Sequence, residues 1–332
     1  MRLANYFALF FCMLYAGTSC ANAQEGIPVY LDYLSDNYYL VYPSMAGIGY
    51  SGKVRLTARQ QWFGVDRAPN LQTLNAHTRI GDRSGVGAII FRDQNGYQSQ
   101  AGLQLTYAHH INFWRERGLN QLSFGISGGF IQNSLDETEF DPLDFDPVIA
   151  GIKQSTSYYN IDLGMSYNFM DFYAHFAVKN LLFVTRDINS DIESPDQRRF
   201  LTSAGYLFEG KRGWLFEPSF LYQWTNLTQE NAIDLNFKAY KEMDFGMVWG
   251  GLSFRQSFDG AEFLDGTQIR DQQLQWLSPI LGVNYNDFMF AYTYSYQFGD
   301  ITFASGGFHQ ITLGYDFWKS KEPVPCHCPW AK

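Results

Sequence analysis

The 332-residue sequence has few of the features by which enzymes and nucleic-acid-binding proteins are recognised. Charged residues make up only 17% of it, and their formal balance is −9 at pH 7. A protein that neutralises phosphates needs a basic surface, so this balance argues against a nucleic-acid partner. The GxSxG, HExxH, P-loop and dinucleotide-binding motifs are all missing. The sequence therefore predicts a protein that is not an enzyme and needs no cofactor.

Long apolar runs are also scarce. Residues 1–23 contain Arg2, an apolar stretch and the small-residue site Ala21-Asn22-Ala23, a pattern typical of a secretory signal peptide. Lipidation of Cys20 is the alternative for this leader. Beyond it no run approaches the about 20 residues that a membrane helix needs. A membrane form of this chain must therefore be a closed barrel, since hydrocarbon leaves exposed backbone groups unsatisfied.

Cysteine is nearly absent: the chain has four, and only Cys326 and Cys328 follow the leader. Both lie in a C-terminal tail, residues 319–332. In an oxidising compartment they could pair with each other or with a partner's thiol. Cys-His-Cys could also supply three zinc ligands, although a closed site needs a fourth. The tail could equally be an incidental flexible end.

Aromatic residues and glycine, by contrast, are abundant, with aromatics at 18% and 30 glycines. Apolar and polar residues alternate with period two through most of the chain, which is typical of β-strands with one apolar face. The alternation predicts fourteen strands, at residues 53–62, 71–80, 85–93, 101–112, 120–132, 157–167, 172–183, 198–208, 214–223, 231–240, 244–255, 273–285, 288–297 and 309–318.

The connections between these strands alternate in length. Short turns such as GDRS (81–84) and KEMD (241–244) are followed by long segments such as TRDINSDIESPDQ (185–197). Short periplasmic turns alternating with longer extracellular loops are typical of outer-membrane barrels. We therefore expect an all-β fold, a transmembrane antiparallel β-barrel of about fourteen strands over residues 51–318, in preference to a secreted β-sandwich.

In a barrel, the polar face of each strand looks into the lumen and the apolar face looks at lipid. A charged side chain that faces lipid at mid-bilayer costs roughly 2–4 kcal/mol. The predicted lumen-facing residues of the first two strands are Arg55, Arg59, Asn75, His77 and Arg79. Large polar and aromatic side chains inside a barrel of this size predict a filled lumen. The segment 24–50 is expected either to plug it or to contact the periplasmic rim.

The sequence also resembles a known family, the PorP/SprF outer-membrane proteins of the type IX secretion system of Bacteroidetes. The resemblance covers nearly the whole mature chain and is closest to the SprF branch, which serves gliding adhesins. It is carried by NYYLVYPSMAGIG (37–49), QQWFGVDRAPNLQTLNAHTRI (60–80), DRSGVGAIIFRDQNGYQSQAGLQLTYAHHI (82–111), LSFGISGGF (122–130), AVKNLL (177–182), FEPSFLYQW (216–224), IDLNFKAY (233–240) and GGFHQITLGYDF (306–317).

The resemblance marks Pro43, Gly47, Trp62, Gly64 and Pro69 as family-motif positions. The early motif of the family usually begins with Asn, and Tyr42 stands in its place here. The resemblance implies binding to partners: export and anchoring of an adhesin with a type B C-terminal domain, and contact with periplasmic ring or gliding components. A passive porin or a hydrophobic-solute channel is the alternative function.

Two further groups of residues are candidates for a metal-binding site. The segment 134–151 carries six carboxylates, and no basic residue occurs before Lys153. Clustered carboxylates could bind Ca²⁺. The segment lacks the spacing of an EF-hand loop, however, and is better explained as an acidic extracellular loop. His109 and His110 are adjacent in a predicted strand and must point to opposite faces, so they cannot chelate one ion together.

Overall fold

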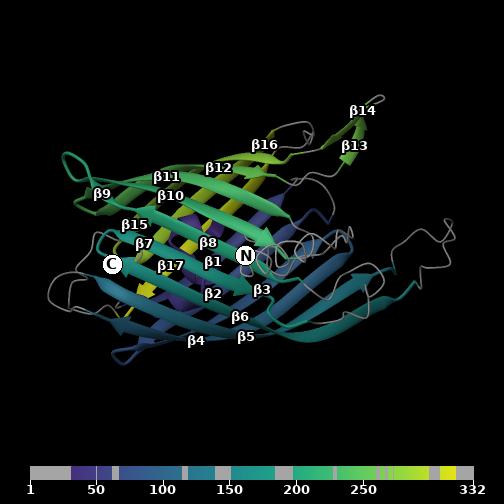
Figure 1. The fold of residues 1–332 in the computed structure, drawn as a ribbon, viewed down its shortest axis with the longest axis horizontal. Coiled ribbons are helices and arrows are strands. Elements are labelled where there is room, and N and C mark those ends of the chain that lie inside the picture. Colours follow the sequence, from purple (N-terminus) through teal and green to yellow (C-terminus); the bar gives the residue numbers. More distant parts are fainter. Residues whose placement is uncertain are drawn as a thin grey trace, which may run out of the picture.

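The computed structural model of the chain is a closed antiparallel β-barrel (Figure 1). The structure describes residues 31–49, 51–61, 67–113, 119–138, 151–183, 197–226, 230–258, 262–265, 268–271, 273–298 and 307–318. Within these ranges no helix is both long enough and apolar enough to cross a membrane.

Consecutive strands pair around the barrel almost entirely in chain order. Their bounds are β1 Gly52–Gln61, β2 Asn70–Ile80, β3 Ser84–Asn95, β4 Gln98–Asn112, β5 Asn120–Asp136, β6 Lys153–Phe169, β7 Phe172–Lys179, β8 Arg199–Tyr206, β9 Phe208–Glu209, β10 Trp214–Thr225, β11 Asn231–Met243, β12 Gly246–Ser257, β15 Gln275–Tyr285, β16 Phe288–Phe298 and β17 Phe308–Phe317. A separate hairpin, β13 Glu262–Asp265 and β14 Gln268–Asp271, lies between β12 and β15.

Pairing of the first and last strands closes the barrel. β1 runs antiparallel to β17 from Gly52 opposite Phe317 to Gln61 opposite Phe308. β8 and β9 both pair with β10 and form one interrupted strand, so the wall has fourteen strands, as predicted. Pairing of β1 with β17 removes the two free edges that an open sheet would have, and this closure is the condition for a β-sheet to span hydrocarbon.

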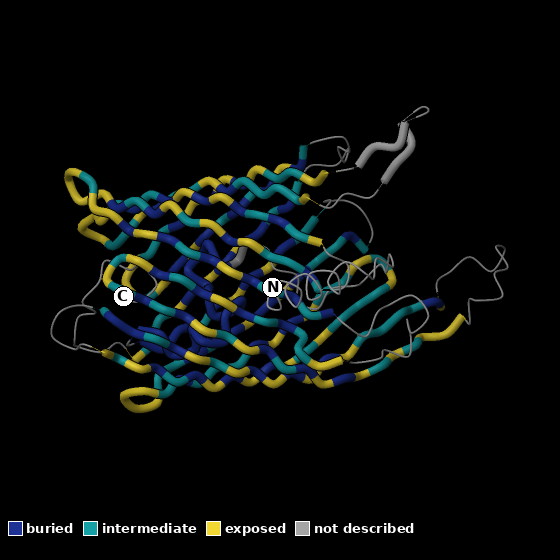
Figure 2. Tube along the Cα trace, viewed as in Figure 1, coloured by how far each residue is buried: buried dark blue, intermediate teal, exposed yellow. Residues whose placement is uncertain are grey.

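The period-two alternation separates an apolar outer face from a polar inner face. On β17, Leu313 is 47% exposed, whereas its neighbour Thr312 is 1% exposed and faces inward. The same buried and exposed alternation runs along the other strands (Figure 2). In water such an outer face would be unstable, and in a bilayer it contacts lipid tails.

Most predicted strand boundaries lie within three residues of the observed ones, and the exceptions are in β5, β6 and β7. β7 ends at Lys179, four residues before the predicted 183. β5 continues to Asp136, which pairs with Lys153 at the start of β6, so both strands extend four residues beyond the predicted 132 and 157. Polar residues dominate these extensions, and an alternation of apolar and polar residues cannot reveal strands there. The β13–β14 hairpin was not predicted either, because it lies within a connection that was expected to be a loop.

Ahead of the barrel, the chain forms three short 3-10 helices, η1 Leu31–Ser35, η2 Tyr38–Leu40 and η3 Pro43–Met45. Every residue from 33 to 49 is buried. The helices lie inside the barrel, where Figure 1 shows them in purple behind the front strands. We call residues 31–49 the interior segment.

Candidate functional site: the interior segment and its contacts

Side chains from many strands hold the interior segment in place. Tyr33 donates a hydrogen bond to Asp234 on β11 at 3.0 Å, and Tyr39 donates to Thr106 on β4 at 2.8 Å. From β7, Lys179 donates to the backbone carbonyl of Leu40 at 3.0 Å. Because these strands lie at different places around the wall, the segment is fixed from several directions.

Several polar contacts converge on a fully buried carboxylate. Glu217 on β10 is 0% exposed and accepts hydrogen bonds from Tyr38 at 3.0 Å, Tyr173 at 2.5 Å and Tyr240. The ammonium group of Lys238 lies 3.1 Å from the same carboxylate. We call these five residues the Glu217 cluster. Tyr38 is the only one of the five that belongs to the interior segment, so the cluster ties that segment to the barrel wall.

Lys238 adds two more contacts to the interior segment. Its ammonium group lies 3.7 Å from the carboxylate of Asp36 and donates to the carbonyl of Leu34 at 3.3 Å. Lys238 and Asp36 are both almost completely buried. An isolated buried charge is costly, so each of these charged groups requires its partners to remain in place.

A row of small residues on the inner wall receives the second half of the interior segment. Hydrogen-bonded strand pairs place Gly85, Ala108, Gly125, Gly164 and Ala177 side by side across β3 to β7. We call this row the small-residue seat. Helix η3 packs against β4, β5 and β6, the middle of the row.

Contact at the seat is so close that side chains would not fit. A Cβ atom at Gly125 would lie 2.3 Å from the carbonyl carbon of Pro43, and one at Gly85 would lie 2.1 Å from the carbonyl oxygen of Ala46. Gly47, at φ +69°, donates its backbone N–H to Nδ1 of His77 at 3.0 Å. The motif Pro43-Ser44-Met45-Ala46-Gly47 is therefore shaped to the wall on which it lies.

The predicted lumen-facing residues are mostly buried in the interior. Arg55, Arg59, Asn75 and His77 are all less than 9% exposed, and Arg79 is half-buried. Arg55 forms an ion pair with Asp316 on the neighbouring β17 at 2.7 Å. These residues do not converge on one point: His77 contacts the interior segment, whereas Arg59 lies at the far end of β1.

The family-motif residues do not gather at one point either. Pro43 and Gly47 lie in the interior segment, on the small-residue seat. Pro69 is half-buried before β2, and its carbonyl accepts the N–H of Gln61 at 3.0 Å. Trp62, Gly64, Cys326 and Cys328, residues 1–23, the tail 319–332 and most of the acidic segment 134–151 lie outside the described residues.

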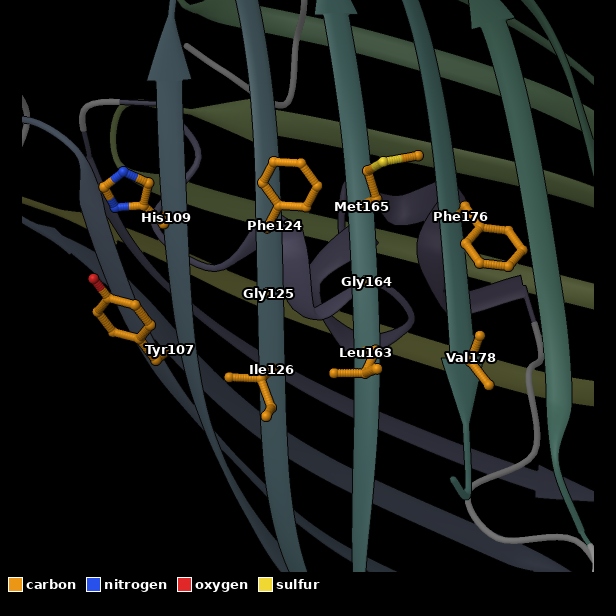
Figure 3. A pocket seen from close by; sticks show the side chains of 10 residues that line it. All are labelled: Tyr107, His109, Phe124, Gly125, Ile126, Leu163, Gly164, Met165, Phe176 and Val178. Atoms are coloured by element: carbon orange, nitrogen blue, oxygen red, sulfur yellow. The ribbon is translucent and has the colours of Figure 1, made fainter. Parts of the chain in front are cut away.

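A groove of about 580 Å³ crosses the outer face of the barrel behind the small-residue seat (Figure 3). Side chains of two parallel rows flank Gly125 and Gly164 there, namely His109, Phe124, Met165 and Phe176 on one side and Tyr107, Ile126, Leu163 and Val178 on the other. Its apolar lining suits lipid tails. His109 lines this groove, whereas the adjacent His110 is 0% exposed and its Nε2 lies 3.0 Å from the Ala46 carbonyl oxygen inside the barrel.

No group of three or more potential metal ligands occurs among the described residues.

The sequence patterns did not predict the Glu217 cluster. Glu217 and Lys238 do occupy inward positions of two predicted consecutive strands, and they lie directly opposite each other in the β10–β11 pair. That cross-strand pair of opposite charges was the available signal. The contribution of Tyr38, more than 170 residues earlier in the chain, had no local signal.

The family comparison adds a decisive observation. A family model described as "Type IX secretion system membrane protein PorP/SprF" matches residues 22–315, most of the chain. The chain belongs to the PorP/SprF family. The predicted resemblance is confirmed, and this PorP/SprF protein is an outer-membrane β-barrel of the type IX secretion system. We expect its short-turn end to be periplasmic and its long-loop end to be extracellular, as is typical of outer-membrane barrels.

No curated protein matches the chain. Among solved structures, it is similar to the TodX deltaS2S3 mutant monoaromatic hydrocarbon channel, at 8% identity and a TM-score of 0.46, covering 91% of this chain and 96% of that one. A Pseudomonas aeruginosa FadL homologue matches at 11% identity and a TM-score of 0.42, with 80% and 89% covered. The translocator domain of NalP from Neisseria meningitidis matches at 10% identity and a TM-score of 0.37, with 86% and 92% covered.

Proposed function

We propose that this PorP/SprF barrel is a binding scaffold that assists secretion and surface anchoring of a large adhesin with a type B C-terminal domain, in support of gliding motility. The family match over residues 22–315 is the observation that carries the proposal. The structure adds a physical reason to prefer a scaffold to a channel, since residues 33–49 are buried inside the barrel and bonded to its wall.

Binding at both ends of a rigid wall is the mechanism that we propose. Fourteen strands in one closed sheet hold the extracellular loops and the periplasmic turns in a fixed relation. The extracellular loops would contact the adhesin domain, and the periplasmic turns would contact ring or gliding components. Neither role requires catalytic chemistry or a cofactor.

Purification of the tagged full chain in mild detergent, followed by identification of bound proteins, tests the scaffold directly. We expect an adhesin C-terminal domain and periplasmic secretion components to be recovered with this protein. An unrelated outer-membrane barrel with the same tag is the control and should recover neither. A clean monomer that carries solute in liposome-swelling assays would instead support the passive channel.

The C-terminal tail provides a second test. We propose that residues 319–332 tether the barrel to periplasmic partners through Cys326 and Cys328. Deleting the tail should lower the recovery of periplasmic partners while adhesin recovery persists. The variant Cys326→Ser with Cys328→Ser separates thiol chemistry from the tail as such, and unchanged recovery with the full deletion would contradict the tether.

A further inference from the structure

A polar groove of about 380 Å³ lies on the outer face of the barrel, at the long-loop end of β1, β2 and β3. Strand pairing places Gln72 directly opposite Arg92, and Asn70 directly opposite Gln94. The polar members of its described lining are Gln60, Arg67, Asn70, Gln72, Arg92 and Gln94. We call it the outer polar groove.

The outer polar groove begins where the lipid-facing belt ends. One row of the outer face across β1 to β4 consists of apolar side chains that are each at least 43% exposed, namely Leu56, Leu74, Ile90 and Leu103. Gln72 and Arg92 lie two residues nearer the long-loop end than this apolar row, which is about 7 Å along the strands. The groove is therefore placed at the level of lipid headgroups, directly beside lipid tails.

Arg92 supplies an unpaired positive charge to the groove. Its guanidinium is exposed and forms no hydrogen bond or ion pair with any of the described residues. The neighbouring Asp93 belongs to the inward-facing row with Leu71, on the other side of the sheet. Arg67 is different, because its guanidinium lies over the ring of Tyr97, 4.6 Å from the centroid. The charge available to a ligand is thus that of Arg92.

Four amide side chains lie beside this charge, those of Gln60, Asn70, Gln72 and Gln94. Within the described part of the chain, none of the four forms a side-chain hydrogen bond. The described lining also contains no carboxylate. Each amide offers two N–H donors and a carbonyl acceptor, so the groove presents one cation and several donors that the protein itself does not use.

We propose that the outer polar groove binds the phosphate-bearing headgroup of a membrane lipid. A guanidinium forms two parallel, charge-assisted hydrogen bonds to a phosphate group, and the amides donate to its remaining oxygens. The acyl chains of the same lipid extend along the apolar row, which a free phosphate ion cannot contact. The proposal does not depend on the identity of the protein that the barrel exports.

Native mass spectrometry of the purified full chain in detergent tests the proposal. The probes are dipalmitoyl phosphatidic acid and dipalmitoylglycerol, which have the same acyl chains and differ by the phosphate group. We expect phosphatidic acid to bind at least about tenfold more tightly, the difference made by one charge-assisted hydrogen bond. Equal binding of the two lipids, or binding of neither, would overturn the proposal.

Variants assign the binding to this groove. Arg92→Gln removes the charge and should weaken phosphatidic acid binding about tenfold. Arg83→Gln makes the same substitution in the exposed turn at the other end of β3 and should leave binding unchanged. Unaltered binding in Arg92→Gln, or an equal loss in Arg83→Gln, would refute the assignment. Heat-dependent gel migration verifies that each variant is folded.

Competition with inorganic phosphate distinguishes a lipid from a free anion. Burial of even two methylene groups is worth about tenfold in affinity. Inorganic phosphate should therefore displace phosphatidic acid only at a concentration at least about tenfold above that of the lipid. Displacement at an equal concentration would assign the groove to free phosphate and contradict the lipid.

Discussion

At Gly125 the barrel wall and the backbone of Pro43 are so close that only a hydrogen atom fits between them. Three residues further along the same strand, Gly128 faces outward, and a Cβ atom there would meet nothing within 4 Å. The same residue type thus serves different purposes at the two positions. Because both glycines lie on β5, they give a matched pair for mutation.

Gly125→Ala should destabilise the protein, because the added methyl group overlaps backbone atoms that cannot rotate away. We expect a loss of about 1–3 kcal/mol in the free energy of unfolding, the usual cost of overpacking. Gly128→Ala should leave it within about 0.5 kcal/mol. Urea titration of both variants in detergent measures the difference, and equal stability would show that the segment does not lie on the seat.

Glu217 is the second residue on which the interior depends. Glu217→Gln removes the charge opposite Lys238 and weakens three tyrosine hydrogen bonds at once. Removing one partner of a buried ion pair costs about 3–5 kcal/mol in the free energy of unfolding. The same urea titration measures this loss. Asp244→Asn, in an exposed turn, is the control and should have little effect.

Removing both charges distinguishes an ion pair from mere packing. In the double variant Glu217→Gln with Lys238→Met, no unpaired lysine remains opposite the amide. The combined loss should be smaller than the sum of the two single losses. An additive result would mean that Lys238 and Glu217 act independently.

Among elements, the interior segment differs most from the rest of the chain. It has only 3-10 turns and few internal hydrogen bonds, and its position comes from contacts with the strands. A segment of this kind is unlike the strands, whose backbone groups are satisfied by their neighbours. Its order should therefore depend on the surrounding wall.

A disulfide should lock the segment to the wall. The hydroxyl oxygens of Ser44 and Ser166 are 2.6 Å apart, close to the geometry of a disulfide. With the tail cysteines replaced by serine, Ser44→Cys with Ser166→Cys should crosslink on oxidation and migrate faster on a heated gel without reductant. The pair Ser44→Cys with Ser253→Cys, on the more distant β12, should not crosslink; crosslinking of both pairs would indicate a mobile segment.

Deletion of residues 31–49 tests what the segment does to the lumen. The full-length protein should show no sustained conductance in planar bilayers, because the lumen is filled. The deletion variant should show discrete conductance steps, provided that its heat-dependent migration indicates a folded barrel. Discrete steps from the full-length protein would contradict a filled lumen and favour the passive channel.

On the scale of the whole molecule, the closed sheet fixes which residues face each side of the membrane. Asn95 lies at the long-loop end of β3, and Asp244 lies in the short turn before β12. In a background without tail cysteines, Asn95→Cys should react with an impermeant maleimide on intact cells. Asp244→Cys should react only after permeabilisation, and the reverse pattern would invert the orientation.

Most of the barrel could be predicted from the sequence, for a physical reason. Each strand meets lipid on one face and the interior on the other, so alternation along β16 or β17 reports a strand without knowledge of its neighbours. The ends of β5 and β6 leave the apolar belt, and there the alternation no longer carries that information. Pro43 and Gly47 could be identified only as motif positions, because the seat that receives them comes from distant strands.

The sequence alone determined the strand number and the separation of an apolar outside from a polar inside, because these follow from period-two patterns local to each strand. Closure of the sheet followed from a separate requirement, since hydrocarbon leaves unpaired backbone groups unsatisfied. Only the tertiary structure decided where the interior segment lies, which glycines receive it, and that Tyr38 shares a carboxylate with Tyr173 and Tyr240. Those contacts join residues far apart in the chain, and no local pattern specifies such a pairing.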